Sequence, residues 1–220
     1  MTKKQKARWF VEALEAEYPD AVCSLEYERP YELLISVRLA AQCTDARVNI
    51  VTRELFRRYP TLQSFADAKA EEVAELVRPC GLGNSKARDI VAACKKLVTE
   101  YGGVVPDSLE ELLKLPGVGR KTANLIIGDV YKKPAVVCDT HCIRITGLLG
   151  LTDSKSPDIV ERQLRAVLPM EKANDFCHRL VLHGRAVCKA RSPRCAVCCM
   201  QANCAGRSRP APTAAPSGRR

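Results

Sequence analysis

Residues 115–121 read LPGVGRK, and this short stretch decides the fold. Glycine tolerates φ > 0 and lets another backbone approach closely, so the segment is expected to turn sharply. The preceding segment, SLEELLKL, predicts a helix that Asp107 or Ser108 caps and that stops at the proline of the turn. Arg120 then begins a second helix that continues through TANLIIGDVY. The stretch therefore predicts a helix, a tight hairpin and a helix over about 107–131.

The rest of the chain shows the same helical periodicity. Apolar residues recur at spacings of three and four, and short segments rich in Pro and Gly separate the runs. No region shows several alternating strands, so the sequence predicts an all-α fold. The expected helices cover 6–18, 31–42, 45–58, 69–77, 85–101, 107–114, 120–131, 140–149, 157–168 and 173–186.

Charge and composition point to a polyanionic partner. Lys and Arg exceed Asp and Glu by 35 − 25 = 10, and 220 residues suffice for one large or two small domains with a buried core. An aromatic content of 5% argues against a stacking platform for single strands, which favours a duplex. The last sixteen residues, 205–220, hold four arginines and no acid and predict a disordered basic tail. Without them the charge is still 10 − 4 = +6.

The N-terminal sequence contains no signal for membrane insertion or secretion. MTKKQKARWFVEALEAEY has no apolar core and no small-residue cleavage site, so it is not a signal peptide. No stretch approaches the ~18 uninterrupted apolar residues of a spanning helix. We therefore expect a cytoplasmic protein with no membrane partner.

The twelve cysteines fall into two classes. Five lie in the segment CKARSPRCAVCCMQANC, where Cys188, Cys195, Cys198 and Cys204 have the spacing C-x6-C-x2-C-x5-C and Cys199 offers a competing thiol. Four thiolates suit zinc or an iron–sulfur cluster, and ligand chemistry alone does not choose between them. The other seven lie singly in helical sequence, where Cys packs as a small hydrophobe: Cys23, Cys43, Cys80, Cys94, Cys138, Cys142 and Cys177.

The hairpin has the chemistry of a phosphate site. The backbone N–H groups of Gly117 to Gly119 are expected to point outwards together at the positive end of the following helix. Leu115 and Val118 flank the glycines and Arg120 follows them, so the segment is more specific than an ordinary turn. Such a site binds DNA without reading its sequence. Lys189, Arg191 and Arg194 of the cysteine loop (188–204) offer a second basic contact with phosphate.

Lys121 and Asp139 form a candidate catalytic pair. Lys121 lies in the first turn of the second helix, where the helix dipole and Arg120 favour the neutral amine, a nucleophile that can form a Schiff base with a sugar. A lysine that clamps phosphate is the alternative, and the hairpin alone leaves both open. Asp139, in AVVCDTHCIRITGLLGL, is an N-cap by default and also suits stabilisation of positive charge during N-glycosidic cleavage. His141 could contact DNA or orient a water.

These segments together resemble the endonuclease III family, the bifunctional DNA glycosylases of the helix-hairpin-helix superfamily. The matching residues are LPGVGRKTAN (115–124), VCDTH (137–141), LAAQCTD (39–45), GLGNSKA (81–87), LHGRAVC (182–188) and the four-cysteine loop. The resemblance covers the chain from about 20 to 204.

The resemblance implies a function and a set of residues. Lys121 attacks C1′ of an oxidised pyrimidine nucleotide in duplex DNA, Asp139 assists, and β-elimination nicks the strand. Cys188, Cys195, Cys198 and Cys204 hold a [4Fe-4S] cluster. Gln42 and Leu82 fill the hole left by the flipped base. The residues expected to contact DNA are Gln42, Leu82, Leu115, Gly117, Val118, Gly119, Arg120, His141, Lys189, Arg191 and Arg194.

The resemblance also implies the domain organisation. A six-helix barrel covers about 23–132, and a second helical domain combines 1–22 with 133–204. The active cleft is expected between them, in a monomer.

Three positions depart from the family pattern: Cys138, where a β-branched residue commonly precedes the aspartate, Gly83, where a bulkier residue is frequent, and the extra thiol of Cys199. A family that excises adenine from mispairs shares the hairpin and the cluster but typically lacks a lysine at position 121 and has a long C-terminal domain. A non-catalytic DNA-binding or redox-sensing module is the alternative from another class.

Overall fold

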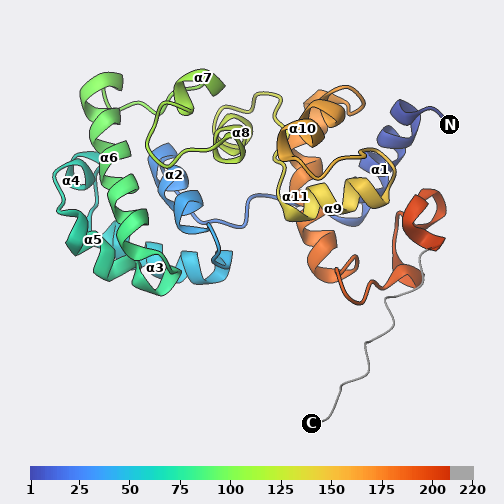
Figure 1. Ribbon diagram of the computed structural model, residues 1–220, viewed down its shortest axis with the longest axis horizontal. Coiled ribbons are helices and arrows are strands. Elements are labelled where there is room, and N and C mark those ends of the chain that lie inside the picture. Colours follow the sequence, from blue (N-terminus) through green and yellow to red (C-terminus); the bar gives the residue numbers. More distant parts are fainter. Residues whose placement is uncertain (209–220) are drawn as a thin grey trace, which may run out of the picture. The chain divides into compact units, whose positions relative to one another are not determined.

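The computed structural model describes residues 1–208, and within this range every regular element is a helix (Figure 1). The prediction of an all-α fold is therefore confirmed. The chain divides into two compact units. One, here the hairpin unit, comprises Cys23–Ala135, and the other, here the cysteine-loop unit, comprises Met1–Val22 and the chain from Val136 onward.

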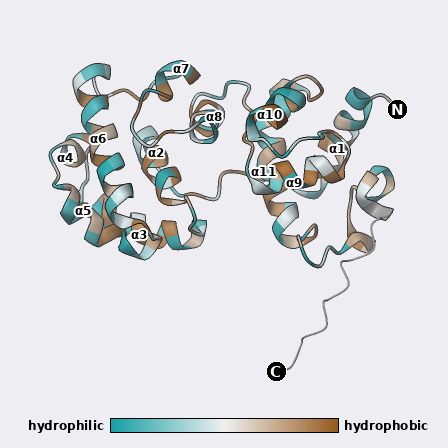
Figure 2. Ribbon diagram, in the orientation of Figure 1, coloured by the Kyte–Doolittle hydropathy of each residue, from teal (hydrophilic) through white to brown (hydrophobic). Residues whose placement is uncertain are grey.

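The hairpin unit is organised around α6, the long helix that contacts α2, α4 and α5. α8 packs against α2 and α7. Brown and teal bands alternate along the helices in Figure 2, as expected for amphipathic segments that bury one face. The elements are α2 (Pro30–Leu39), α3 (Asp45–Arg58), α4 (Leu62–Ala66), α5 (Ala70–Val77), η1 (Arg78–Cys80), α6 (Gly83–Tyr101), α7 (Leu109–Leu112) and α8 (Arg120–Asp129).

The cysteine-loop unit joins the two ends of the chain, because α11 packs against both α1 and α9. Phe10, Leu14, Phe176 and Leu180 are fully buried in its core. The elements are α1 (Lys3–Glu17), α9 (Thr140–Leu148), α10 (Pro157–Arg165), η2 (Met170–Lys172), α11 (Ala173–Ala186), η3 (Cys195–Val197), η4 (Gln201–Asn203) and η5 (Ala205–Ser208).

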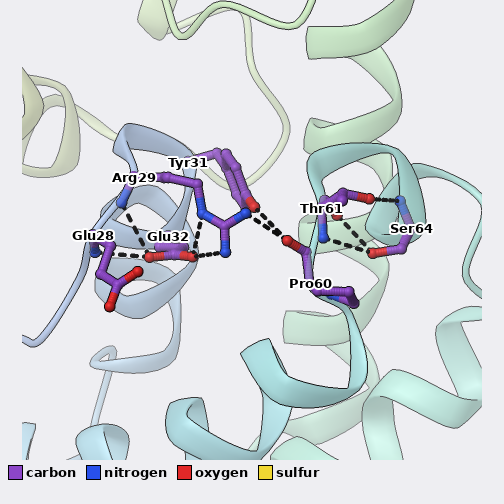
Figure 3. A network of polar contacts seen from close by, with 7 residues as sticks. All are labelled: Glu28, Arg29, Tyr31, Glu32, Pro60, Thr61 and Ser64. Atoms are coloured by element: carbon purple, nitrogen blue, oxygen red, sulfur yellow. Dashed lines mark hydrogen bonds and ion pairs between the residues drawn. The ribbon is translucent and has the colours of Figure 1, made fainter.

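The N-terminus of α2 is fixed by a polar network (Figure 3). The buried carboxylate of Glu32 accepts hydrogen bonds from the backbone N–H groups of Glu28 (2.8 Å) and Arg29 (3.1 Å). The Arg29 guanidinium donates to the same carboxylate (2.8 Å) and to the carbonyl of Pro60. Because each buried polar group here has a partner, the network ties the start of α2 to the loop before α4.

Several expected boundaries were wrong, for local physical reasons. α4 was missed because five residues are too few to show a helical period, although Thr61 caps the helix by accepting from the N–H of Ser64. α2 ends at Leu39 rather than at 42, because Gln42 has a left-handed backbone, with φ of 59°. The expected disordered tail was wrong for 205–208, which form η5. The rest of it, 209–220, lies outside the described residues.

None of the helices formed by the described residues combines the length and the hydropathy needed to cross a bilayer.

Candidate active site and DNA-contacting loops

The hairpin forms between α7 and α8. Ser108 caps α7 by accepting a hydrogen bond from the N–H of Glu111 (3.3 Å), as one of the two predicted caps. The turn closes where the N–H of Val118 donates to the carbonyl of Leu115 (3.2 Å). Gly117 has φ of +72°, which makes glycine the favoured residue there. α8 then begins after Gly119, which offers no side chain to cap the helix.

The expectation of three outward N–H groups in this turn was wrong. The Val118 N–H is already used within the turn, as in an ordinary tight turn. The N–H groups of Gly117 and Gly119 make no backbone hydrogen bond with any described residue. Leu115 is buried, its N–H donates to the carbonyl of Leu112 and its carbonyl accepts from Val118, so this residue anchors the turn. The donors that the hairpin leaves open to an anion are therefore, among the described residues, two glycine amides and the uncapped start of α8.

An ion pair lies directly behind the turn. Arg38 of α2 donates from Nε to Asp89 of α6 (2.8 Å), and its Nη2 lies 2.6 Å from the same carboxylate. A Cβ placed on Gly117 would lie 2.8 Å from Cβ of Asp89 and 2.9 Å from Nε of Arg38. Both side chains are partly buried, so they offer little room to retreat. The pair therefore sets the position of the turn and demands glycine at 117.

Gly117→Ala should consequently lower the free energy of unfolding by about 2 kcal/mol, because it combines positive φ with overlap against the ion pair. It should also weaken binding to an undamaged duplex. Gly119→Ala is the matched control, since a Cβ there meets nothing within 4 Å and the residue has φ of −95°. Chemical denaturation and fluorescence anisotropy measure the two effects. Equal destabilisation by both variants would contradict this description of the turn.

Lys121 is the second residue of α8, and its side chain is exposed. It makes no hydrogen bond or ion pair with any other described residue, so the amine is available to an incoming ligand. Arg120 is likewise exposed beside it. The hairpin unit therefore presents a lysine immediately after the glycine turn, in the place where the sequence predicts a nucleophile.

Asp139 is the N-cap of α9, as the sequence predicts. Its Oδ1 accepts a hydrogen bond from the N–H of Cys142 at 2.7 Å, and the residue is half-buried. His141 lies two residues further on, with Nδ1 at 3.5 Å from Nη2 of Arg144. A Cβ at Gly184 of α11 would overlap this imidazole, so α11 must present a glycine there. Asp139 and His141 belong to the cysteine-loop unit, whereas Lys121 belongs to the hairpin unit.

Gln42 and Leu82 share two unusual properties. Both are exposed, Leu82 by 59%, and both have left-handed backbones, with φ of 59° for Gln42 and 52° for Leu82. Among residues 1–208 only Lys132 is a further non-glycine residue with positive φ. Strain of this kind gathers at binding sites. Gly83, beside Leu82, is small for a local reason, because a Cβ there would lie 3.1 Å from the carbonyl oxygen of Ala74.

The cysteine loop brings its four thiols near one another. Burial raises the pKa of the Cys198 thiol, and the neighbouring Cys188, Cys204 and Cys195 thiols raise it further. Nη1 of Arg144 donates to Cys188 Sγ (3.5 Å). In the part of the chain that the structure describes, no three His, Cys, Asp or Glu side chains converge closely enough to hold a single metal ion.

His183 and Tyr18 form a chain of hydrogen bonds to the cysteine loop. Nε2 of His183 lies 3.3 Å from Cys198 Sγ, and its Nδ1 lies 3.2 Å from the Tyr18 hydroxyl. With that hydroxyl donating to Nδ1, Nε2 carries the proton and donates to the sulfur.

The basic residues of the loop, Lys189, Arg191 and Arg194, are all exposed. Of the seven scattered cysteines, five are buried and Cys23 and Cys43 are half-buried.

Sequence reasoning missed the residues that support these loops: Arg38, Asp89, Gly184 and Lys86. The Arg38–Asp89 pair joins two helices far apart in sequence, and no local pattern announces it. Lys86 did carry a signal, because it occupies the first position of the buried stripe of α6 that continues through Ile90, Cys94 and Leu97. A charged residue on a buried stripe indicates buried hydrogen-bond partners.

The comparisons with known proteins agree with one another. A family model described as HhH-GPD superfamily base excision DNA repair protein matches residues 35–170. Endonuclease III of Synechocystis sp. is 44% identical over 198 residues, which cover 90% of each chain. Endonuclease III of Bacillus subtilis is 41% identical, covering 85% of this chain and 86% of the relative. For the Escherichia coli protein the identity is 36%, over 91% of this chain and 95% of the relative.

Solved structures give the same result. A trapped covalent intermediate of an endonuclease III with DNA and a non-covalent endonuclease III–DNA complex both match with a TM-score of 0.88. Each is 41% identical in sequence, over 94% of this chain and 98% of the solved chain.

Proposed function

Because this chain belongs to the endonuclease III family of the HhH-GPD superfamily, and is a base excision repair DNA glycosylase and AP lyase, we propose that Lys121 and Asp139 carry out its reaction. The substrate is an oxidised pyrimidine in duplex DNA. The observation that carries this assignment is the amine of Lys121, which is exposed, has no partner among residues 1–208 and follows the glycine turn at the start of α8. An amine so placed is open to a sugar whose phosphate the turn holds.

In the proposed reaction the Nζ lone pair of Lys121 attacks C1′, and the bond from C1′ to the base nitrogen breaks. The Asp139 carboxylate takes a proton from the attacking amine and stabilises positive charge that develops on the sugar. Ring opening leaves a Schiff base between Nζ and C1′. Loss of a proton from C2′ then expels the 3′ phosphate, and water releases Lys121. No divalent metal takes part.

The residues proposed to bind DNA have two roles: some position the duplex through its phosphates, and others support base flipping. Gly117, Gly119 and Arg120 are proposed to hold phosphates, which fixes the register without reading sequence. Gln42 and Leu82 are proposed to enter the space that the flipped nucleotide leaves, which offsets part of the unstacking cost. His141 is proposed to contact the same strand near Asp139. Lys189, Arg191 and Arg194 add phosphate contacts, and Leu115 and Val118 are proposed to shape the turn that carries the two glycine amides.

Cys188, Cys195, Cys198 and Cys204 are proposed to hold a [4Fe-4S] cluster. A zinc ion would need the four sulfurs about 2.3 Å from one point. Four cysteine thiolates are the ligand set of a [4Fe-4S] cluster, and the four thiols of this loop are near neighbours. The donors from His183 and Arg144 fit thiolate sulfurs. The bound cluster would supply cross-linking of the loop and a redox couple.

Cys188→Ser should therefore lose iron and the broad absorption expected near roughly 400 nm from iron–sulfur charge transfer. Cys199→Ser is the matched control, an adjacent thiol outside the proposed ligand set, and should keep both. Iron analysis and absorption spectra of the purified proteins decide between them. A colourless wild-type protein that contains zinc, or loss of iron in Cys199→Ser, would refute this ligand set.

The partner is damaged double-stranded DNA, and we propose that the enzyme works as a monomer on the chromosome in the cytoplasm, because the similar proteins are bacterial repair enzymes.

The function is tested by borohydride trapping on a duplex with one thymine glycol, in EDTA. A covalent adduct together with strand nicking is expected. Base loss with no adduct would instead mean a monofunctional glycosylase.

A further inference from the structure

Lys86, near the start of α6, is a lysine with no exposed surface. Its Nζ donates to three backbone carbonyls: Leu39 (2.8 Å), Ala41 (2.8 Å) and Cys80 (2.7 Å). An ammonium group has three N–H donors, so each donor has an acceptor. Among the described residues no carboxylate pairs with it.

The three carbonyls belong to two loops that are far apart in sequence. Leu39 and Ala41 lead into Gln42, in the loop between α2 and α3. Cys80 ends η1, two residues before Leu82. The ammonium is therefore a single point that fixes both segments, here called the Gln42 loop (39–42) and the Leu82 loop (80–82).

These two loops carry two of the three strained non-glycine residues found in residues 1–208. A left-handed backbone at a non-glycine residue is strained and persists only where the surroundings impose it. Both Gln42 and Leu82 are exposed, so packing of their own side chains does not impose it. The hydrogen bonds from Lys86 end at Ala41, directly before Gln42, and at Cys80, two residues before Leu82, and they supply the constraint.

Stability alone does not account for a lysine at this position. Burial lowers the pKa of Lys86, which reflects the cost of taking an ammonium group out of water. The position belongs to an apolar stripe where a hydrophobic residue of similar volume would pack at no such cost. Lys86 is also no rival nucleophile, because it is enclosed and all of its donors are used. What the ammonium provides is a fixed spacing between two loops.

We propose that Lys86 is a positioning residue of the DNA-contacting surface, which ties the Gln42 loop to the Leu82 loop so that both side chains enter the damaged duplex together. This inference rests on the proposed function, because it takes Gln42 and Leu82 to be the residues that fill the hole. Lys86 itself does not touch DNA.

The test is Lys86→Met, which keeps the volume and removes the charge and the donors. Lys95→Met is its matched control, an exposed lysine on the same helix. The probe is a duplex with a tetrahydrofuran abasic analogue opposite 2-aminopurine, whose fluorescence rises when it is unstacked. For Lys86→Met we expect the preference for this duplex over an undamaged one to fall roughly tenfold, and most of the fluorescence rise to be lost. Affinity for the undamaged duplex, held by the hairpin, should stay within about twofold.

Lys86→Gln is a second variant, which tests the same role if Lys86→Met does not fold. Lys86→Gln keeps a shorter polar group that can satisfy some of the carbonyls but cannot reach both loops, so it should show the same loss in smaller degree. Gln42→Ala and Leu82→Ala are reference variants that should also reduce the preference. If these references behave like wild type, the assigned roles of Gln42 and Leu82 fail and the inference falls with them. If they reduce the preference while folded Lys86→Met, or Lys86→Gln in its place, matches wild type, only the inference about Lys86 is overturned.

Discussion

Lys121→Ala should abolish strand nicking and borohydride trapping while duplex binding is retained. Removal of a nucleophile costs a rate factor of roughly 10³ or more, since no other group supplies the bond to C1′. Binding should change little, because the groups proposed to hold the phosphates, Gly117, Gly119 and the start of α8, do not depend on this side chain. The measurements are single-turnover nicking of a thymine glycol duplex in EDTA, trapping with borohydride, and anisotropy with an undamaged duplex.

Lys121→Arg separates the two interpretations that the sequence leaves open. Arginine keeps the positive charge and binds phosphate at least as well as lysine, but its guanidinium stays protonated and does not attack a sugar. If Lys121 is the nucleophile, the Arg variant should be as inactive as the Ala variant. If Lys121 only clamps a phosphate, the Arg variant should nick at close to the wild-type rate. Nicking that disappears in EDTA would instead indicate metal-assisted hydrolysis.

Much of the fold was predictable because its signals are local. Helical periodicity, the cap at Ser108 and the cap at Asp139 each depend on a few neighbouring residues, and the structure has them where the sequence places them. α4 was not predicted because a helix of five residues is too short to show a helical period of apolar residues. The Val118 N–H was assigned outward because the sequence does not show which donors a turn consumes internally.

The support of the site was beyond sequence reasoning for a different reason. Arg38 and Asp89 are 51 residues apart, and Lys86 reaches carbonyls 45 and 47 residues away. Backbone carbonyls are present at every residue, so no residue type marks the ones that a buried lysine will find. The sequence could point to residues proposed to contact DNA, whereas the residues that hold those loops in place emerge only from tertiary contacts.

The second large effect is expected for Asp139→Asn. Base removal from the thymine glycol duplex should fall by roughly 10²–10⁴-fold, since the amide neither accepts the proton from Lys121 nor stabilises positive charge on the sugar. Asparagine caps helices about as well as aspartate, so the start of α9, the melting temperature and duplex affinity should be unchanged. Asp139→Ala should show the same catalytic loss and an additional destabilisation of about 1 kcal/mol from the lost cap.

These two variants separate the roles that one carboxylate performs. A purely structural Asp139 predicts an active Asn variant and an Ala variant that loses stability, affinity and activity together. A catalytic Asp139 predicts that both variants lose base removal and that only the Ala variant loses stability. At a preformed abasic site no glycosidic bond has to break, so strand nicking there should suffer less than base removal. Serine or threonine would cap α9 equally well, and only a carboxylate adds charge stabilisation to the cap, which is why the second outcome is expected.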